Sequence, residues 1–166
     1  INFEGTVKFS SYVEAGVENH TRKTNPLVDY GPFGKHLVVE ELKSDEDYIL
    51  YQGETKNSKL SMACGSVVVT DGHMTECVIG EEDGHTSYEV YAEEGKEVTF
   101  EKMIAYTSEL DMPKEEILPF IRAKLSEAKV LGYDKYEALQ KEKMDEFWSK
   151  ADIKIEGDEE LQQGIR

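Results

Sequence analysis

The sequence predicts a mainly β protein with C-terminal helices, and three observations lead to this prediction. Segments rich in Val, Ile, Tyr and Thr recur at short spacing through residues 1–110 of the 166-residue chain. Gly and Asp punctuate these segments, which is typical of antiparallel strands in a sandwich or a large sheet. From Asp111 onwards, the apolar residues recur at helical spacing instead. We therefore expect an antiparallel β-sandwich over residues 1–110, followed by two helices within 111–151.

The strands are expected where β-branched and aromatic residues cluster. They are predicted at 6–13, 36–42, 47–53, 60–70, 73–80, 87–92 and 98–107. The dipeptide Asp71-Gly72 lies between two apolar runs, which favours a hairpin that pairs 60–70 with 73–80. In that hairpin Cys64 and Cys77 would share a face but sit diagonally, about 7–8 Å apart. Because an unstrained disulfide needs closer Cβ atoms, we expect two reduced thiols, typical of a cytoplasmic protein.

Residues 19–35 interrupt the strand pattern. They hold two prolines and two glycines, and they have few apolar residues. Long loops in compact domains are often functional. Tyr30 and Phe33 lie in this stiffened, non-periodic segment, and we expect them to face a ligand or an interface. Simple packing of the loop is the alternative.

Two helices are predicted after Asp111. The first has one apolar face, formed by Ile117, Leu118, Ile121, Leu125 and Ala128. Because Pro119 is tolerated in a first turn but not in a helix interior, we expect this helix to begin near Leu118. Gly132 suits the residue that ends it, and Asp134 suits the N-cap of the next. One face of the second helix holds Tyr136, Leu139, Lys143, Phe147 and Ala151.

Residues 158–166 read as the first turns of a third helix, with acids at its start and Leu161 and Ile165 four residues apart. A helix this short is marginal alone. We therefore expect the chain to be a piece of a longer polypeptide.

The charge balance bears on the kinds of partner. The chain has 35 acidic and 19 basic residues, a formal net charge of −16. Nucleic-acid binding and docking on an anionic membrane both need clustered Lys and Arg, so neither is expected. No apolar run approaches the roughly 20 residues that span a bilayer. The acidity is interpreted as a solubility feature.

The residues carry no catalytic or metal-binding pattern. The four histidines are scattered, and neither a Cys-x-x-Cys pair nor a phosphate-binding glycine loop occurs. Glu81-Glu82-Asp83-Gly84 places three carboxylates before a glycine, but a Ca²⁺ loop needs alternate ligands and a late Glu. We predict no catalytic residue, no metal and no cofactor in this chain.

Both ends of the chain resemble glycoside hydrolase family 65, which contains maltose, trehalose and kojibiose phosphorylases. Residues 147–166, FWSKADIKIEGDEELQQGIR, are similar to the family's domain junction, in which a Trp precedes an aliphatic strand, Glu-Gly-Asp and a helix with Leu-Gln and Arg. Residues 4–19, EGTVKFSSYVEAGVEN, resemble a strand that ends near Gly-Val-x-Asn. The family more often has an acid where Ala15 stands.

The resemblance implies that residues 1–110 are the later strands of a galactose-mutarotase-like supersandwich. It implies linker helices over 111–151 and the start of an (α/α)6 catalytic barrel over 152–166. In the full enzyme the barrel carries a general-acid Glu and the phosphate site, so the disaccharide and its co-substrate, inorganic phosphate, bind through it. The fragment alone is then predicted to be inactive, because no catalytic residue of the family maps onto it. On this reading the loop over residues 19–35 lends Tyr30 and Phe33 to the rim of the sugar pocket.

Two alternatives to a phosphorylase fragment stay open at this point. One is a fragment of a trehalase-like hydrolase of the same family, in which water replaces phosphate. The other is an autonomous carbohydrate-binding or interaction module. A partial sandwich would also expose a sheet face and open edges, which proteins avoid. We therefore expect a second copy of the chain to cover the bare face, or the helices to shift onto it.

Overall fold

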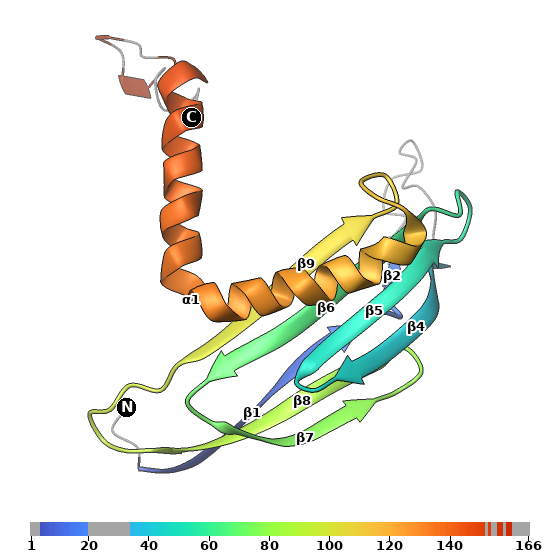
Figure 1. The fold of residues 1–166 in the computed structure, drawn as a ribbon. Coiled ribbons are helices and arrows are strands. Elements are labelled where there is room, and N and C mark those ends of the chain that lie inside the picture. Colours follow the sequence, from blue (N-terminus) through green and yellow to red (C-terminus); the bar gives the residue numbers. More distant parts are fainter. Residues whose placement is uncertain (1–3, 20–33, 152, 154–155, 158, 161–166) are drawn as a thin grey trace. The chain divides into compact units, whose positions relative to one another are not determined.

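The computed structural model describes residues 4–19, 34–151, 153, 156–157 and 159–160 (Figure 1). The chain divides into two compact units, Ile1–Val130 and Leu131–Arg166, which we describe separately. The domain boundaries expected at residues 110 and 151 stay predictions.

The first unit contains two antiparallel sheets, which confirms the predicted β-sandwich. One sheet has the strand order β1 (Gly5–Glu14), β8 (Asp83–Ala92), β7 (His73–Ile79). The other has the order β4 (Leu37–Asp45), β5 (Tyr48–Thr55), β6 (Ser61–Thr70), β9 (Phe100–Ser108). A short ladder joins β2 (Glu18–Asn19) to β3 (Gly34–Lys35). The predicted strand segments all contribute to these sheets, although their ends differ by a few residues.

The four-stranded sheet is the central layer of this unit. In β5, the consecutive side chains of Tyr48, Ile49, Leu50 and Tyr51 are all buried. Because successive side chains of a strand point to opposite faces, both faces of this sheet are covered. The helix covers one face and the three-stranded sheet covers the other (Figure 1).

The predicted hairpin between β6 and β7 is wrong. β6 pairs with β5 and β9, whereas β7 pairs with β8 in the other sheet. Asp71 and Gly72 thus carry the chain from one sheet to the other. Cys64 lies opposite Tyr51 and Tyr106 in its own sheet. Both cysteines are unpaired thiols, as predicted, but they belong to different sheets.

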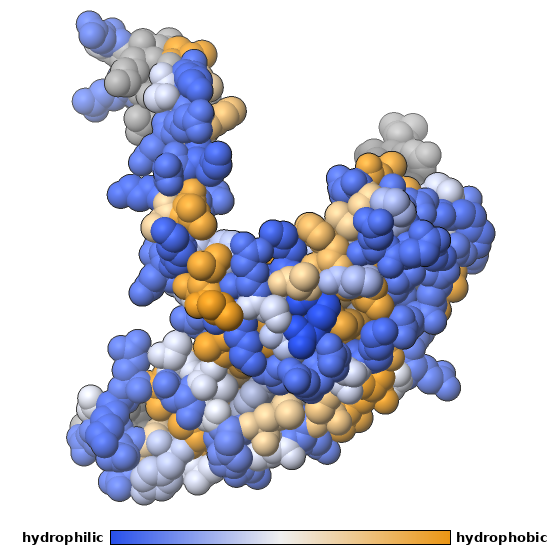
Figure 2. All heavy atoms as spheres, in the orientation of Figure 1, coloured by the Kyte–Doolittle hydropathy of each residue, from blue (hydrophilic) through white to orange (hydrophobic). Residues whose placement is uncertain are grey.

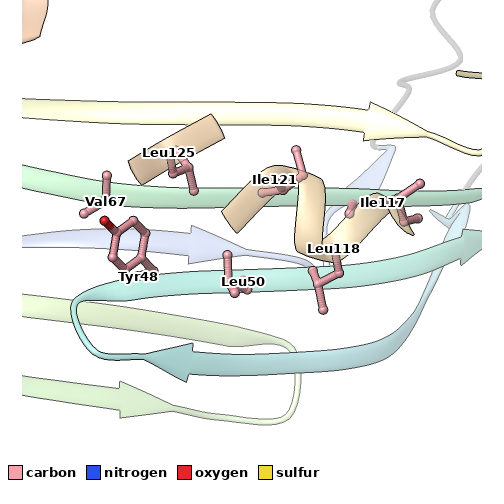
Figure 3. Packing of buried hydrophobic residues seen from close by; sticks show 8 residues of the cluster. Tyr48, Leu50, Val67, Ile117, Leu118, Ile121 and Leu125 are labelled. Atoms are coloured by element: carbon pink, nitrogen blue, oxygen red, sulfur yellow. The ribbon is translucent and has the colours of Figure 1, made fainter. Parts of the chain in front are cut away.

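The first half of helix α1 (Lys114–Ala151) packs on the outer face of the four-stranded sheet (Figure 3). The predicted apolar face forms this contact, since its residues at 117, 118, 121 and 125 are buried. Gly65 lies directly beneath the helix. A Cβ at this position would come within 2.8 Å of Ile121 Cγ2 and Leu125 Cδ1, so glycine permits the close approach.

Polar contacts hold the same half of the helix over the turn between β4 and β5. Arg122 pairs with Asp45 at 2.6 Å, and its guanidinium lies 3.5 Å from the centre of the Tyr48 ring. Lys129 pairs with Asp47 at 2.5 Å. These ion pairs are partly exposed, so we assign them to orienting the helix more than to stabilising the fold. In Figure 2, hydrophilic residues dominate the visible outer side of this region.

The helix begins earlier than predicted. It starts at Lys114, where the amide of Glu116 donates to the carbonyl of Pro113 at 2.9 Å. Pro119 therefore lies inside the helix, in its second turn, and the buried contacts of the neighbouring residues outweigh one lost backbone hydrogen bond. The predicted break at Gly132 is confirmed, because its φ of 73° and ψ of 170° are not helical.

The second unit contains the rest of α1, up to Ala151. Phe147 and Trp148 pack against each other edge to face, with ring centroids 5.0 Å apart. Glu159 and Glu160 are helical, whereas most of the predicted third helix lies outside the described residues. No helix in the described part of the chain is long and apolar enough to cross a membrane.

Candidate functional site

The candidate site lies at the base of the loop predicted to be functional. β2 and β3 close this base through the pairs Glu18–Lys35 and Asn19–Gly34. The loop itself, residues 20–33, is outside the described residues, and so are Tyr30 and Phe33. Their assignment to a sugar-pocket rim therefore stays a prediction.

The turn before β8 anchors this base to the end of β1. The carbonyl of Glu82 accepts hydrogen bonds from the amides of Ala15 at 2.7 Å and Gly16 at 3.2 Å. The carboxylate of Glu82 forms an ion pair with Lys35. A Cβ on Gly16 would lie 2.6 Å from Glu82 Oε2, so a larger residue there would displace the Glu82 carboxylate. The acidic turn thus fixes the loop base, a role that sequence reasoning did not assign to it.

A surface pocket of about 530 Å³ opens beside this anchor. Its apolar part comes from Leu37, Val38, Val39 and Leu42. Its polar part comes from Lys35, Glu40, Lys56, Glu81 and Glu82. Ammonium donors and carboxylate acceptors around an apolar floor suit a neutral polyol, whose hydroxyl groups both donate and accept.

Three charged residues of this pocket form ion pairs: Lys35 with Glu82, and Glu40 with Lys114, which lies outside the lining. The hydrogen bond from Lys35 to Glu82 raises the pKa of the Lys35 ammonium. The hydrogen bond from Lys114 to Glu40, at 2.6 Å, likewise raises the pKa of Lys114. These lysines are cations throughout the neutral range, so they can position a ligand but cannot act there as general bases.

A second, narrower cavity of about 190 Å³ lies between the two sheets. Tyr51, Cys64, Lys102 and Tyr106 contribute its polar groups. Burial raises the pKa of the Cys64 thiol, which leaves it a protonated, weak nucleophile at neutral pH. Burial also raises the pKa of Tyr51, whose hydroxyl is buried and has no hydrogen-bond partner among the described residues.

The sequence analysis predicted neither the pocket nor the cavity, because their walls come from strands far apart in the chain. In the sequence, the local sign of such a cavity is a glycine two residues after a tyrosine on the same strand, at Tyr51 and Gly53. A Cβ on Gly53 would lie 2.2 Å from the Tyr51 hydroxyl, so glycine makes room for the phenol. Within the described residues, no group of three His, Cys, Asp or Glu side chains is arranged to hold a metal ion.

Comparison with known proteins places this fold in a family. The family description "Glycosyl hydrolase family 65, N-terminal domain" matches residues 1–147. The alpha,alpha-trehalose phosphorylase of Thermoanaerobacter brockii is 29% identical over 169 residues, which cover 100% of this chain and 22% of the relative. The alpha,alpha-trehalose phosphorylase of Geobacillus stearothermophilus is 32% identical over 170 residues, covering 100% of this chain and 21% of the relative.

A solved structure agrees at the level of the fold. The chain named "Putative kojibiose phosphorylase from human microbiome" superposes with a TM-score of 0.75 at 14% identity, over 99% of this chain and 20% of that one. The present chain thus spans about a fifth of the length of the relatives that it matches. Since the family description covers most of its length, the chain belongs to glycosyl hydrolase family 65, in that family's N-terminal domain.

Proposed function

We propose that this chain is the architectural, non-catalytic N-terminal segment of a disaccharide phosphorylase. The observation that carries the proposal is the full-length alignment of the chain with two trehalose phosphorylases. The sandwich would support a catalytic barrel that follows it in the longer protein, with residues 152–166 as the start of that barrel. The only co-substrate required is inorganic phosphate, and no cofactor takes part.

The reaction of the longer protein would be inverting phosphorolysis of an α-glucoside such as maltose, trehalose or kojibiose. A carboxylic acid would protonate the glycosidic oxygen while phosphate attacks the anomeric carbon from the opposite face. Both groups would belong to the barrel. The disaccharide and phosphate would accordingly bind outside the residues described above.

The loop anchored by β2 and β3 would contribute to the rim of that sugar pocket through Tyr30 and Phe33. The rigid base of the loop supports this role, because the Glu82 anchor and the Lys35 ion pair fix both points where the loop leaves the sandwich. Substituting Tyr30→Ala and Phe33→Ala in the longer protein should raise KM for the disaccharide. An unchanged KM would contradict the rim assignment.

The test of the proposed function is a phosphate-dependence assay on the longer protein. It is incubated with maltose, trehalose and kojibiose, with and without inorganic phosphate, and the products are separated by anion-exchange chromatography. We expect a sugar phosphate and a free monosaccharide from one disaccharide, formed only when phosphate is present. Two free sugars formed without phosphate would identify a family 65 hydrolase instead.

We also propose that a second copy of the chain covers part of the sandwich. The exposed apolar side chains of Ile104 and Tyr106 on an edge strand support this, because monomeric proteins rarely leave such edges bare. Light scattering on the purified chain should give twice the 18.9 kDa mass of one copy. A mass of one copy at all concentrations would contradict the proposal.

A cytoplasmic location is the last part of the proposal. It is supported by the two unpaired cysteines, since extracellular domains of this size commonly use their cysteines in disulfides. Cell fractionation with an antibody to the longer protein should place it in the cytoplasmic fraction. Recovery outside the cytoplasm would overturn this part alone.

A further inference from the structure

The part of helix α1 that follows the break at Gly132 has an apolar side, which we call the distal face. At 3.6 residues per turn, six large side chains fall on this side of residues 133–151. They are Tyr133, Tyr136, Leu139, Met144, Phe147 and Trp148. The opposite side holds small and charged residues, namely Ala138, Glu142, Asp145 and Ser149.

The distal face is exposed, unlike the apolar face of the same helix before the break. Its six side chains are exposed by 38–56%. The four large apolar residues of the first segment, at 117, 118, 121 and 125, are exposed by 7% or less, because the four-stranded sheet covers them. An amphipathic helix needs a surface on which to bury its apolar side. The described residues supply that surface for the first segment and leave the distal face uncovered.

The composition of the distal face is that of a protein interface. Tyr, Trp, Phe and Met are enriched in the buried centres of protein–protein contacts. Phe147 and Trp148 form an edge-to-face pair with ring centroids 5.0 Å apart, which presents one broad aromatic surface. Helices that lie on membranes carry an excess of Lys and Arg on the polar side, whereas acids and lysines are in near balance over residues 133–151. A protein partner therefore fits this face better than a lipid surface.

The comparisons place the distal face at a domain boundary. The description of the family's N-terminal domain matches residues 1–147, so it stops within this face. The Thermoanaerobacter brockii relative aligns with the whole chain, and the alignment covers 22% of its length. Ala151 is 15 residues before Arg166, a span of at most about 50 Å of extended chain. A domain that follows residue 166 would begin within reach of the distal face.

We infer that the distal face is the docking surface for the domain that follows residue 166 in the longer protein. The face would pack against apolar side chains on helices of that domain, with the aromatic pair near the centre of the contact. The break at Gly132 separates the two apolar faces of α1, so that each has its own partner. This inference rests on that part of the proposed function in which a further domain follows the chain.

The test is made on the longer protein, with a protease recognition sequence inserted after Gly157, which lies beyond the end of α1. The folded protein is cleaved there, and the two pieces are followed by size-exclusion chromatography and light scattering. We expect the pieces to stay together. Phe147→Glu should weaken their association at least about tenfold, because it would bury an unpaired carboxylate in the contact.

Ala138→Glu is the matched control. It adds the same charge to the same helix, but on the opposite, exposed side. The cleaved pieces of this variant should associate as in the unsubstituted protein. In the 166-residue chain, Phe147→Glu should leave the melting temperature unchanged, because Phe147 is exposed there by 56%. That measurement separates loss of the contact from loss of folding.

Trp148 reports on the distal face directly, because it is the only tryptophan of the chain. In the isolated 166-residue chain we expect the long-wavelength emission of an exposed indole and ready quenching by acrylamide. A shielded indole in the monomeric chain would show that the chain covers this face by itself, which would overturn the inference.

Three further results would also overturn it. Cleaved pieces that associate equally well with Phe147→Glu would place the contact elsewhere. A dimer of the 166-residue chain that Phe147→Glu dissociates would make a second copy the occupant. A blue shift of Trp148 emission on addition of phosphatidylglycerol vesicles would make a membrane the occupant.

Failure of the proposed function is recognised separately. If the longer protein forms no sugar phosphate, while its cleaved pieces separate only with Phe147→Glu, the phosphorylase assignment is wrong and the docking surface stands. If phosphorolysis occurs and the pieces ignore the substitution, the docking surface is wrong and the phosphorylase assignment stands.

Discussion

Gly65 is the residue that allows helix α1 to pack closely on the four-stranded sheet. A methyl group at this position would come within 2.8 Å of Ile121 and Leu125, and overpacking of this kind costs about 1–3 kcal/mol. We therefore expect Gly65→Ala to lower the free energy of unfolding by that amount in urea titrations. In a Leu125→Ala background the same substitution should cost less, because the clashing methyl group is gone. If Gly65→Ala lowered the free energy of unfolding equally in both backgrounds, the strain would not come from the contact with Leu125.

Tyr48 combines three contacts in one side chain. Its ring lies beneath the guanidinium of Arg122, its hydroxyl is hydrogen bonded to Ser126 at 3.1 Å, and its body is buried in the core under the helix. Tyr48→Phe removes only the hydrogen bond and should cost about 0.5–1.5 kcal/mol of stability. Tyr48→Leu also removes the cation–π contact, so thermal denaturation should show a larger loss. Equal melting temperatures for the two variants would contradict the role of the ring.

The pair Lys8–Glu89 joins directly opposed residues of β1 and β8, with a separation of 2.5 Å. The hydrogen bond from Lys8 holds the pKa of Glu89 below its ordinary value of 4.5. A carboxylate with a lowered pKa stabilises the fold above the unfolded value, and this contribution is lost as pH falls through the folded one. Stability should thus decrease below pH 4.5 less steeply in Lys8→Met than in the unsubstituted chain.

Urea midpoints measured from acidic to neutral pH check this prediction. Lys135→Met, which makes the same change in charge in the second unit, is the control and should keep the original slope. If Lys8→Met kept that slope too, Glu89 would not contribute to the acid sensitivity.

At the scale of elements, strand positions could be predicted, but their partners could not. Asp71-Gly72 has the chemistry of a tight turn, yet β6 and β7 belong to different sheets. The feature that distinguishes β6 from β7 is the burial pattern along β6. Val67 and Val68 are consecutive and both buried, which is typical of a central strand covered on both faces, whereas the neighbouring β7 is largely exposed. In this sheet β5 and β9 occupy both edges of β6, so β7 pairs with β8 in the other sheet.

The helical elements were predictable for a different reason. The positions of Ile117, Ile121 and Leu125 follow the helical period, and all three are buried against the sheet. The error at Pro119 arose because propensity alone was weighed there. The surrounding contacts outweigh the loss of one backbone hydrogen bond, and the sequence does not contain those contacts. The predicted site residues Tyr30 and Phe33 lie outside the described residues and stay a prediction. The pocket beside Glu82 could not be predicted, because its walls come from strands far apart in the chain.

Gly132 sets the length of the first helical segment. Its φ of 73° is unfavourable for other residues, while the residues on both sides of it are helical. Alanine favours the helix by about 1 kcal/mol over glycine. Gly132→Ala should therefore close the break and increase the helical signal in far-ultraviolet circular dichroism, without lowering the melting temperature. A lower melting temperature with no gain in helicity would show that the fold requires the break.

At the scale of the whole molecule, the proposed role is that of a scaffold, and the two cavities lined by described residues hold no activated nucleophile or general base. Lys35 of the pocket is a paired cation, and burial raises the pKa of the Cys64 thiol. The family match agrees with this description, since the chain aligns with about a fifth of each phosphorylase. An autonomous carbohydrate-binding module would differ from such a scaffold in one respect: it would bind sugar by itself.

Isothermal titration of the 166-residue chain with maltose, trehalose and kojibiose tests the central claim most directly. If the chain is the scaffold of a phosphorylase whose sugar site lies in a following barrel, none of the three disaccharides should give heat beyond that of dilution. Saturable binding of any one of them, lost in a Lys35→Ala or Lys56→Ala variant that still folds, would contradict the claim and identify the pocket beside Glu82 as a sugar site in its own right.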